Sequence, residues 1–301
     1  MSNSVAVVMN PVAGPPRNRL SVDDVSELFS AHGIDVEIMV THLPRGASEL
    51  AAGAAEKHDV VVAVGGDGTV SEIATGLVGA DAKLGIIPCG SGNDFAAGLG
   101  LNSIEDGVEA VVAGKILSID VAEFAGKRFV NSCGLFLDGD ASLVAAGVPR
   151  QFGKFRYLIA SASSIIKCKP IPAKWQFDSD HGHNVVNGKW MLVEVGNGPY
   201  CGGGFKLTPA ADMTDGLLDF CMVSEMPKLK LARMLPKGID GSHLDRPEVI
   251  YPRCSGALVT IEEQFAVHWD GEAQKLPAGS YRFDVIPGAL QVLTSGRTGD
   301  V

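Results

Sequence analysis

The chain has 301 residues, of which 46% are hydrophobic, 6% aromatic and 20% charged. This composition suits one large or two ordinary folded domains and excludes intrinsic disorder. The chain carries 35 acidic and 25 basic residues, a net charge of -10. Duplex binding needs a basic footprint, so we expect no nucleic-acid partner.

No apolar run approaches the roughly 18 residues that a membrane-spanning helix needs. The first residues carry no basic region or cleavage pattern of a secretion signal. The six cysteines are scattered and form no C-x-x-C pair. We therefore expect reduced, mostly buried thiols and a cytoplasmic location.

Strand-like and helix-like apolar periodicities alternate over the first 120 residues. Strands are expected at 5–9, 34–40, 59–64, 84–88 and 116–121. Helices are expected at 20–32, 47–57, from Thr69 onward and at 103–113. This alternation predicts an α/β domain whose parallel sheet is covered by helices on both faces.

The pattern changes after about residue 122. A hairpin between Phe124 and Phe129 begins a series of strands, which two helical stretches interrupt. The strands are expected at 189–195, 217–223, 257–262, 265–269 and 281–286, and the helices near 141–167 and 228–239. These runs predict a β-rich antiparallel sandwich. We expect domains at 1–122 and 123–287, and the tail, about 288–301, is a candidate to pack back on the first domain.

Two glycine-rich loops each follow a predicted buried strand. Gly65–Thr69 comes after Val60–Val64, and Cys89–Ala96 comes after Leu84–Pro88. Glycines let backbone N–H groups approach an anion, and an acid such as Asp67 is compatible with phosphate when Mg²⁺ lies between them. The alternative for Asp67 is a helix N-cap in a tight turn. Both loops are expected at the carboxyl edge of the sheet, where open α/β sheets bind ligands.

With these loops, the chain resembles the diacylglycerol kinase catalytic-domain family, which includes bacterial lipid kinases and sphingosine kinases. The resemblance covers essentially the whole chain in motif order. Its motifs are Asn10–Gly14, Gly65–Thr69, Gly90–Ala96, Gly202–Lys206, Asp215–Asp219 and Asp270–Glu272.

The resemblance implies binding of ATP and a catalytic Mg²⁺ by the first domain. Asp67 would hold the metal ion, and Ser91 would contact the phosphates. The residues implied on the nucleotide side are Asn10, Gly14, Thr41, Gly65, Gly66, Gly68, Thr69 and Ser91.

The resemblance also implies the acceptor side of the reaction. Glu272 would be the general base on the acceptor hydroxyl, with Asp270 in the polar network around it. Asn93 and Asp94 would face the lipid headgroup and the metal–water network. A structural Mg²⁺ would use the Asp215 carboxylate and the backbone carbonyls of Asp212 and Leu217.

Simpler alternatives stand beside these roles. Asp270-Gly271 is a strong type I′ hairpin signal, and such a turn can also present Glu272. Asp215-Gly216 reads equally as a solvated turn. The chain departs from the family at Phe136, where glycine is usual; a bulky ring there could narrow or reshape the acceptor pocket, which leaves the identity of the acceptor open.

A basic stretch lies between Asp140 and Asp178, where six basic and no acidic residues occur. Its range Arg150–Lys174 also holds several large apolar residues. One interpretation is peripheral contact with an anionic membrane surface, and the other is a helix packed on the sandwich with a solvated basic face.

These features together predict an ATP-dependent lipid kinase at the inner face of the membrane, with diacylglycerol as first-choice acceptor. The rivals are a kinase of a soluble acceptor, similar to NAD kinases, and a non-catalytic nucleotide or lipid sensor. A homodimer is compatible with the sequence.

Overall fold

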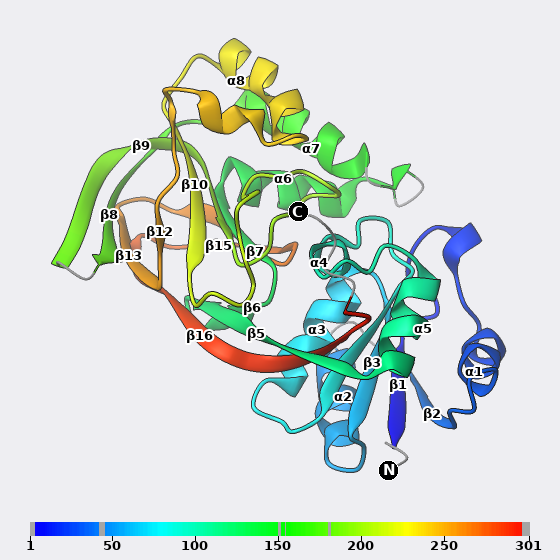
Figure 1. Cartoon of the computed structure of the whole chain (residues 1–301). Coiled ribbons are helices and arrows are strands. Elements are labelled where there is room, and N and C mark those ends of the chain that lie inside the picture. The colour runs from blue at the N-terminus through cyan, green and yellow to red at the C-terminus, as the bar shows by residue number, and fades with distance from the viewer. Residues whose placement is uncertain (1–3, 42–45, 150–151, 154, 180–181, 297–301) are drawn as a thin grey trace. The chain divides into compact units, whose positions relative to one another are not determined.

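The computed structural model describes residues 4–41, 46–149, 152–153, 155–179 and 182–296 (Figure 1). The chain divides into two compact units. Unit 1 comprises Met1–Ile119 and Gly288–Val301, and unit 2 comprises Asp120–Pro287. The division falls close to the expected boundary near residue 122, and the tail from Gly288 groups with unit 1. Two strands, β5 (Lys115–Phe124) and β16 (Gly279–Thr294), run from one unit into the other.

Unit 1 alternates strands with helices, as predicted. Its strands are β1 (Val5–Met9), β2 (Val36–Val40), β3 (Val60–Gly65) and β4 (Lys83–Pro88). Its helices are η1 (Pro16–Asn18), α1 (Val22–Ser30), α2 (Ala47–Ala55), α3 (Asp67–Leu77), α4 (Asp94–Gly98) and α5 (Ile104–Ala113). The strands pair in parallel in the order β2-β1-β3-β4, with Val292 of β16 beside β4.

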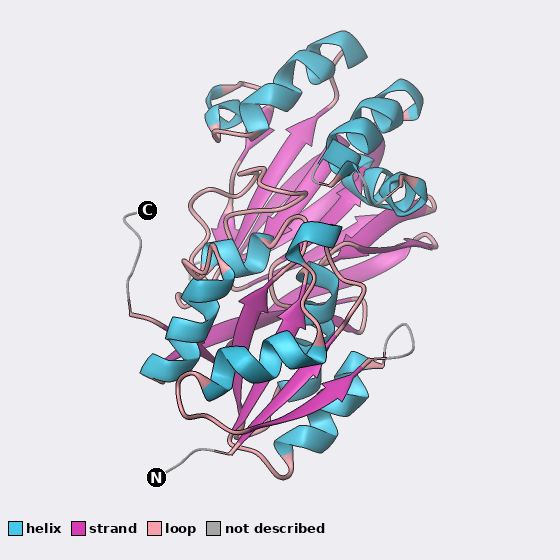
Figure 2. Cartoon of the chain, turned by 90° about the vertical axis from the view of Figure 1, so that its right-hand side faces the viewer, coloured by secondary structure: helices cyan, strands magenta, loops and turns pink. Residues whose placement is uncertain are grey.

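Both faces of this sheet are covered. Val7 and Val62 pack against Phe29 of α1 and Val108 of α5. The neighbouring residues along each strand point to the opposite face and are equally buried there. Helix α2 contacts β1 and β3, helix α3 contacts β3 and β4, and Figure 2 shows helices flanking the strands of unit 1 on both sides. Continuous burial explains why these strands read as unbroken apolar runs.

Unit 2 is built mainly of antiparallel strands. They are β6 (Lys127–Phe129), β7 (Ser132–Phe136), β8 (Ile171–Ser179), β9 (Gly182–Gly196), β10 (Leu218–Ser224), β11 (Val249–Ile250), β12 (Arg253–Cys254), β13 (Gly256–Ile261), β14 (Phe265–Trp269) and β15 (Glu272–Leu276). The strand order is β15-β14-β7-β9-β8-β13-β16, and β10 pairs with β9.

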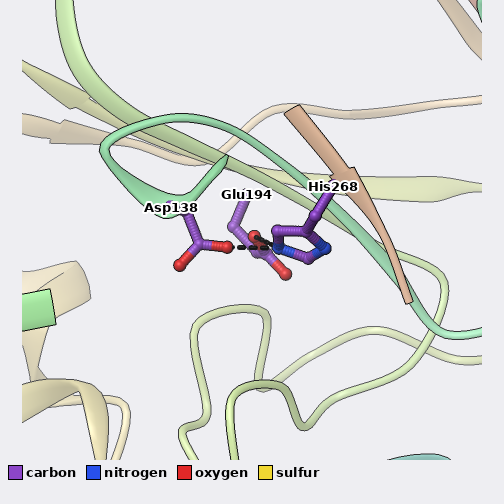
Figure 3. A group of neighbouring side chains, drawn as sticks. All are labelled: Asp138, Glu194 and His268. Carbon is purple, nitrogen blue, oxygen red and sulfur yellow. Dashed lines mark hydrogen bonds and ion pairs between the residues drawn. The ribbon is translucent and has the colours of Figure 1, made fainter. Parts of the chain in front are cut away.

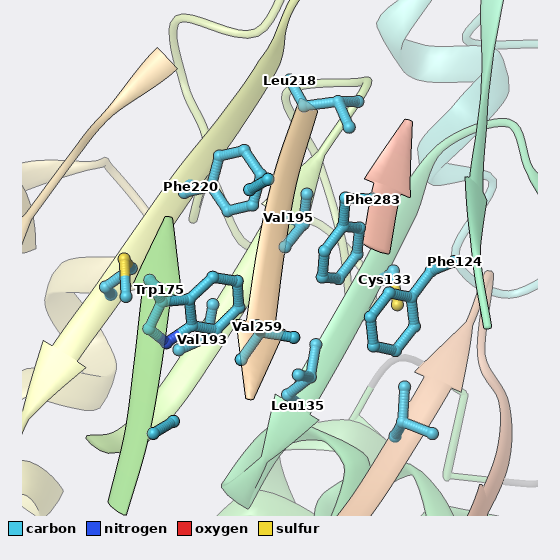
Figure 4. Packing of buried hydrophobic residues seen from close by; sticks show 14 of the residues in the cluster. Phe124, Cys133, Leu135, Trp175, Val193, Val195, Leu218, Phe220, Val259 and Phe283 are labelled. Carbon is cyan, nitrogen blue, oxygen red and sulfur yellow. The ribbon is translucent and has the colours of Figure 1, made fainter. Parts of the chain in front are cut away.

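Aromatic side chains fill the core of unit 2 (Figure 4). Phe124 and Phe283 stack with ring centroids 3.9 Å apart. Trp175 packs edge-on against Phe220, with centroids 5.9 Å apart. These residues come from β5, β8, β10 and β16, so one cluster joins strands that are distant in the sequence.

The remaining helices of unit 2 are α6 (Leu137–Gly147), α7 (Phe155–Lys167), α8 (Lys228–Met234), η3 (Leu235–Gly238) and η4 (Ser242–Asp245). The single helix expected near 141–167 is two helices, because α6 ends before Pro149. The guanidinium of Arg156 donates to the carbonyls of Ala145 and Val148, which caps the end of α6. No described helix has the length and apolar character needed to cross a membrane.

Phe136 lies between β7 and α6 with a φ of 65°, a backbone conformation that favours glycine. Its ring is 1% exposed and packs 6.0 Å from that of Phe265. Phe136 therefore lies in the hydrophobic core of unit 2, and its effect on the acceptor stays a prediction.

Replacing Phe136 with glycine sets two effects against each other. Relief of backbone strain is worth about 1–3 kcal/mol, whereas loss of a buried phenylalanine costs about 3–5 kcal/mol. We expect F136G to lower the free energy of unfolding by about 1–3 kcal/mol, measured by urea denaturation. Ala125, with a φ of 52° at a half-buried turn position, is the control. A125G removes little packing and is expected to be near neutral; a stabilised F136G would contradict this account.

Candidate active site

The loops that follow the parallel strands of unit 1 meet at one edge of the sheet. The backbone N–H of Asn10 donates to the carbonyl of Val64, and that of Cys89 donates to Gly65. Thr41, after β2, is held in the same way by the carbonyl of Met9. The carboxyl ends of four strands thus bring the predicted nucleotide-side residues of β1–β4 to a common edge.

Three glycines keep this edge bare of side chains. A Cβ on Gly66 would lie 2.9 Å from the Cα of Gly90, and one on Gly90 would collide with Gly66 in turn. Gly14 has a φ of 70°, and a Cβ there would collide with the carbonyl of Cys89. The predicted need for glycine therefore has a steric basis, because the loops pack against each other with no room for a Cβ; glycine-rich loops of this kind suit the binding of anionic groups.

Asp67 is the first residue of α3 and joins the two glycine-rich loops. Its Oδ2 accepts the backbone N–H of Asn93 at 2.7 Å, and its Oδ1 accepts that of Phe95 at 3.3 Å. Burial raises the pKa of Asp67, and these N–H groups oppose the rise. The carboxylate is therefore held between two helix starts, where a cation would relieve the cost of its buried charge.

The other predicted residues of unit 1 divide into two groups. Asn10 supports the edge, since its Nδ2 donates to Thr69 Oγ1 at 3.3 Å and its Oδ1 accepts the N–H of Val12. Asn93 has a φ of 61°, and its Oδ1 accepts the N–H of Gly90 at 2.9 Å. The amide of Asn93 thus stabilises its own loop, and its place beside the lipid headgroup stays a prediction. Asp94 is buried, whereas Ser91 and Gly68 are exposed.

Glu272 follows a tight turn between β14 and β15. Asp270 and Gly271 have φ values of 47° and 85°, as the predicted type I′ hairpin requires. The carboxylate of Asp270 accepts three backbone N–H bonds, all 2.9 Å long, from residues 130, 131 and 132. Glu272 is 47% exposed, and its Oε1 lies 3.2 Å from Lys127 Nζ. The turn therefore presents an accessible carboxylate on a firmly anchored loop.

The structural Mg²⁺ implied by the resemblance stays a prediction, and its one carboxylate ligand has other partners in this structure. Both carboxylate oxygens of Asp215 are engaged, one by the N–H of Leu217 and the other by the guanidinium of Arg253. Nε of Arg253 also lies 3.0 Å from the fully buried Asp219. Burial raises the pKa of Asp219, and Arg253 opposes that rise. Arg253 thus supplies the positive charge that the resemblance assigned to a cation bound by Asp215, Asp212 and Leu217.

Unit 2 contains an apolar pocket of about 670 Å³, including the space at its mouth. Side chains from α6, α7, α8, η3 and two strands surround it. Its apolar lining includes Leu137, Leu192, Phe205, Leu207, Val223, Leu231, Met234 and Leu235. Asp138 and Tyr157 contribute polar atoms. The shape and lining suit a hydrocarbon chain that carries a small polar group.

Asp138 belongs to a cluster with Glu194 and His268 that sequence reasoning missed (Figure 3). His268 Nε2 hydrogen-bonds Asp138 Oδ2 and lies 3.7 Å from Glu194 Oε2. A Cβ on Gly134 would collide with all three groups. The one signal in the sequence was Glu194 itself, an isolated acid within the apolar strand run 190–195.

Two family models match the chain. Residues 4–124 match the diacylglycerol kinase catalytic domain, and residues 132–294 match the YegS C-terminal NAD kinase beta sandwich-like domain.

Curated relatives agree with this match over nearly the full length. The chain is 30% identical over 304 residues to the diacylglycerol kinase of Mycobacterium tuberculosis (strain ATCC 25618 / H37Rv), covering 96% of this chain and 94% of the relative. It is 25% identical over 284 residues to the diacylglycerol kinase of Bacillus subtilis (strain 168), covering 91% of each.

A crystal structure from Bacillus anthracis str. Sterne superposes with a TM-score of 0.79 at 26% identity and covers 97% of each chain. The predicted fold class, an α/β domain followed by an antiparallel β-rich domain, is confirmed.

Arg253 generates a prediction about metal dependence. Because unit 2 balances Asp215 and Asp219 with its own guanidinium, chelation of divalent ions should leave the thermal midpoint of unfolding unchanged. R253M should lower the free energy of unfolding by roughly 3 kcal/mol, since it leaves a buried carboxylate unpaired. R246M, at an exposed arginine, is the matched control. If the thermal midpoint of the wild type falls on chelation and recovers with Mg²⁺, unit 2 does hold a structural ion and this prediction is wrong.

Proposed function

The chain belongs to the diacylglycerol kinase catalytic-domain family, and from this we propose that it transfers the γ-phosphate of ATP to a lipid hydroxyl, with diacylglycerol as the first acceptor to test. The apolar pocket of unit 2 is the observation that best supports a lipid as the acceptor. A soluble, polar acceptor such as NAD has no use for a wall of aliphatic side chains, so the pocket favours a lipid over the soluble-acceptor rival.

The bare glycine edge of unit 1 supports the binding of nucleotide phosphates. Gly14, Gly66 and Gly90 let the backbone of these loops come close together without side chains, and backbone donors in such loops can stabilise the charge of a transferring phosphoryl group. Asp67 offers the oxygen ligands that Mg²⁺ prefers. When bound there, Mg²⁺ would neutralise phosphate charge.

Glu272 is the proposed general base. An alcohol must lose its proton as it attacks phosphorus, and a carboxylate within hydrogen-bond reach can accept that proton. The exposed position of Glu272 on an anchored hairpin suits this role, and Lys127 holds its carboxylate in place. A non-catalytic sensor would have no need of such a base.

Helix α7, in the basic stretch, supports contact with a membrane surface chiefly through its exposed apolar side chains. Its exposed side chains Phe155, Ile159 and Ile166 fall at helical spacing on one side, and Ile166 is 73% exposed. Arg156 is turned inward to α6, while Lys167 and Lys169 are exposed at the end of the helix. Arg150 and Lys154 lie outside the described residues. An apolar stripe with basic residues beside it is typical of helices that lie in an anionic interface.

The role of Glu272 as general base can be tested by replacing its carboxylate with an amide. E272Q should lower kcat by about 10²- to 10⁴-fold, because the amide cannot accept the proton, while affinity for ATP stays within a factor of two. Turnover of labelled ATP and equilibrium nucleotide binding measure the two effects. E263Q, at an exposed carboxylate of the same unit, is the control and should match the wild type. Normal turnover by E272Q would remove this residue as the base.

Membrane contact through α7 can be tested by removing its exposed apolar side chains. Replacing Phe155, Ile159 and Ile166 together with serine should lower partitioning onto phosphatidylglycerol-containing vesicles at least tenfold, since burying each apolar side chain contributes about 1 kcal/mol or more. V185S removes an exposed apolar side chain from β9 and should leave partitioning unchanged. Equal vesicle binding by the triple variant and the wild type would refute contact through α7.

A further inference from the structure

The cluster of Asp138, Glu194 and His268 has the ligand types of a metal site, but the position of one proton argues against a metal ion. Nδ1 of His268 accepts the backbone N–H of Gly271 at 3.2 Å. A proton of the ring therefore lies on Nε2, where it is donated to Asp138. A metal ion needs the lone pair of that same nitrogen, and ligating histidines donate from the other nitrogen. The cluster is thus a hydrogen-bonded group that orients Asp138.

Negative charge in this cluster is concentrated on Asp138. Glu194 is fully buried, and among the described residues neither of its carboxylate oxygens has a hydrogen-bond partner. Burial and the charge of Asp138 raise the pKa of Glu194 to about 7. For Asp138, burial raises the pKa, but the interaction with His268 lowers it by more. Of the two carboxylates, Asp138 is therefore the stronger acid and keeps its charge when Glu194 takes up a proton.

Asp138 is also the member of the cluster that reaches the apolar pocket. Its side chain is 20% exposed, against 6% for His268 and none for Glu194. Among the described residues that line the pocket, Asp138 is the one carboxylate in a mostly apolar wall. In Figure 3 one oxygen of Asp138 meets His268, and the other points away from the ring.

The polar end of the pocket adjoins the turn that presents Glu272. Tyr157 lines the pocket, and a Cβ on Gly271 would lie 3.2 Å from its hydroxyl. His268 contacts the same glycine through Nδ1. A ligand whose chain fills the pocket would therefore bring its polar end to Asp138 and to the hairpin of Glu272 together.

We propose that Asp138 determines acceptor specificity by binding a second hydrogen-bond donor, a hydroxyl or ammonium group, next to the hydroxyl that is phosphorylated. This inference rests on the proposed lipid kinase activity and refines its acceptor. Diacylglycerol has one free hydroxyl, which is the group to be phosphorylated, so it offers no second hydrogen-bond donor to the Asp138 oxygen that faces away from His268. A monoacylglycerol or a long-chain amino alcohol supplies one. A lipid with a phosphate near this end is repelled by the carboxylate.

A polar group that a substrate leaves unpaired in a closed site is a strong source of discrimination. We therefore expect the kcat/KM of the wild type for monoacylglycerol to exceed that for diacylglycerol at least tenfold. Glu194 and His268 act as positioning residues, and their loss should move the same ratio in the same direction.

The test compares kcat/KM for monoacylglycerol, diacylglycerol and sphingosine in matched mixed micelles. In D138N the amide oxygen still accepts the His268 proton, while the NH₂ group faces the ligand as a second donor. The monoacylglycerol-to-diacylglycerol ratio should fall to about one in D138N and decrease in E194Q. D140N, at a half-buried acid on the same helix, should keep the wild-type ratio.

The outcomes separate this inference from the proposed function. Wild-type activity with an equal ratio in D138N and wild type overturns the role of Asp138 and leaves the lipid kinase intact. A wild type that phosphorylates no lipid overturns the proposed function itself. A preference for sphingosine that D138N abolishes identifies the donor as ammonium, whereas a preference for monoacylglycerol identifies it as hydroxyl.

Discussion

The two glycine-rich loops of unit 1 depend on one interaction, that of the Asp67 carboxylate with the backbone. The two oxygens of this carboxylate accept N–H groups from the loop after β4, so one side chain fixes two glycine-rich loops against each other. Gly66 and Gly90 make that approach possible because neither has a Cβ. The cost is a buried charge, visible as a raised pKa, which backbone donors offset in part. A site that needs a cation beside phosphate retains such a charge at a cost to stability.

In unit 2, backbone N–H groups and one arginine side chain neutralise or hydrogen-bond several carboxylates. The carboxylate of Asp270 is satisfied by three backbone N–H groups, and this anchors the hairpin that presents Glu272. Arg253 bridges Asp215 and Asp219 where family resemblance implied a metal ion. In the third case, Asp138, the charge faces an apolar pocket, and the partner we propose for it is the substrate. The carboxylates at the hairpin and beside Arg253 thus stabilise the fold, whereas the role we propose for Asp138 is substrate recognition.

The sequence predicted what depends on local pattern. Strands β1, β3 and β4 read as unbroken apolar runs because both faces of the sheet are buried, and the glycine loops stood directly after them. The Asp270-Gly271 hairpin was predicted for the same reason, since its geometry depends on two adjacent residues.

What the sequence did not predict depends on contacts between distant segments. Asp138 and His268 are 130 residues apart in the chain, and the walls of the pocket come from elements between them. Arg253 belongs to no recognised sequence motif, so its pairing with Asp215 was not predicted from the sequence. The bulk of Phe136 suggested an altered pocket, whereas its positive φ turns the ring into the core. The inward turn of Arg156 likewise became visible only when α6 and α7 proved to be separate helices.

The most direct test of the central claim is transfer of labelled γ-phosphate from ATP with Mg²⁺ to a panel of acceptors in mixed micelles. The panel contains diacylglycerol, monoacylglycerol, phosphatidylglycerol, sphingosine and ceramide, with NAD as the soluble acceptor, and Asp67→Ala is measured beside the wild type. The account predicts a labelled lipid that the variant does not form. Label on NAD alone, or bound ATP with no labelled product from any acceptor, would contradict it.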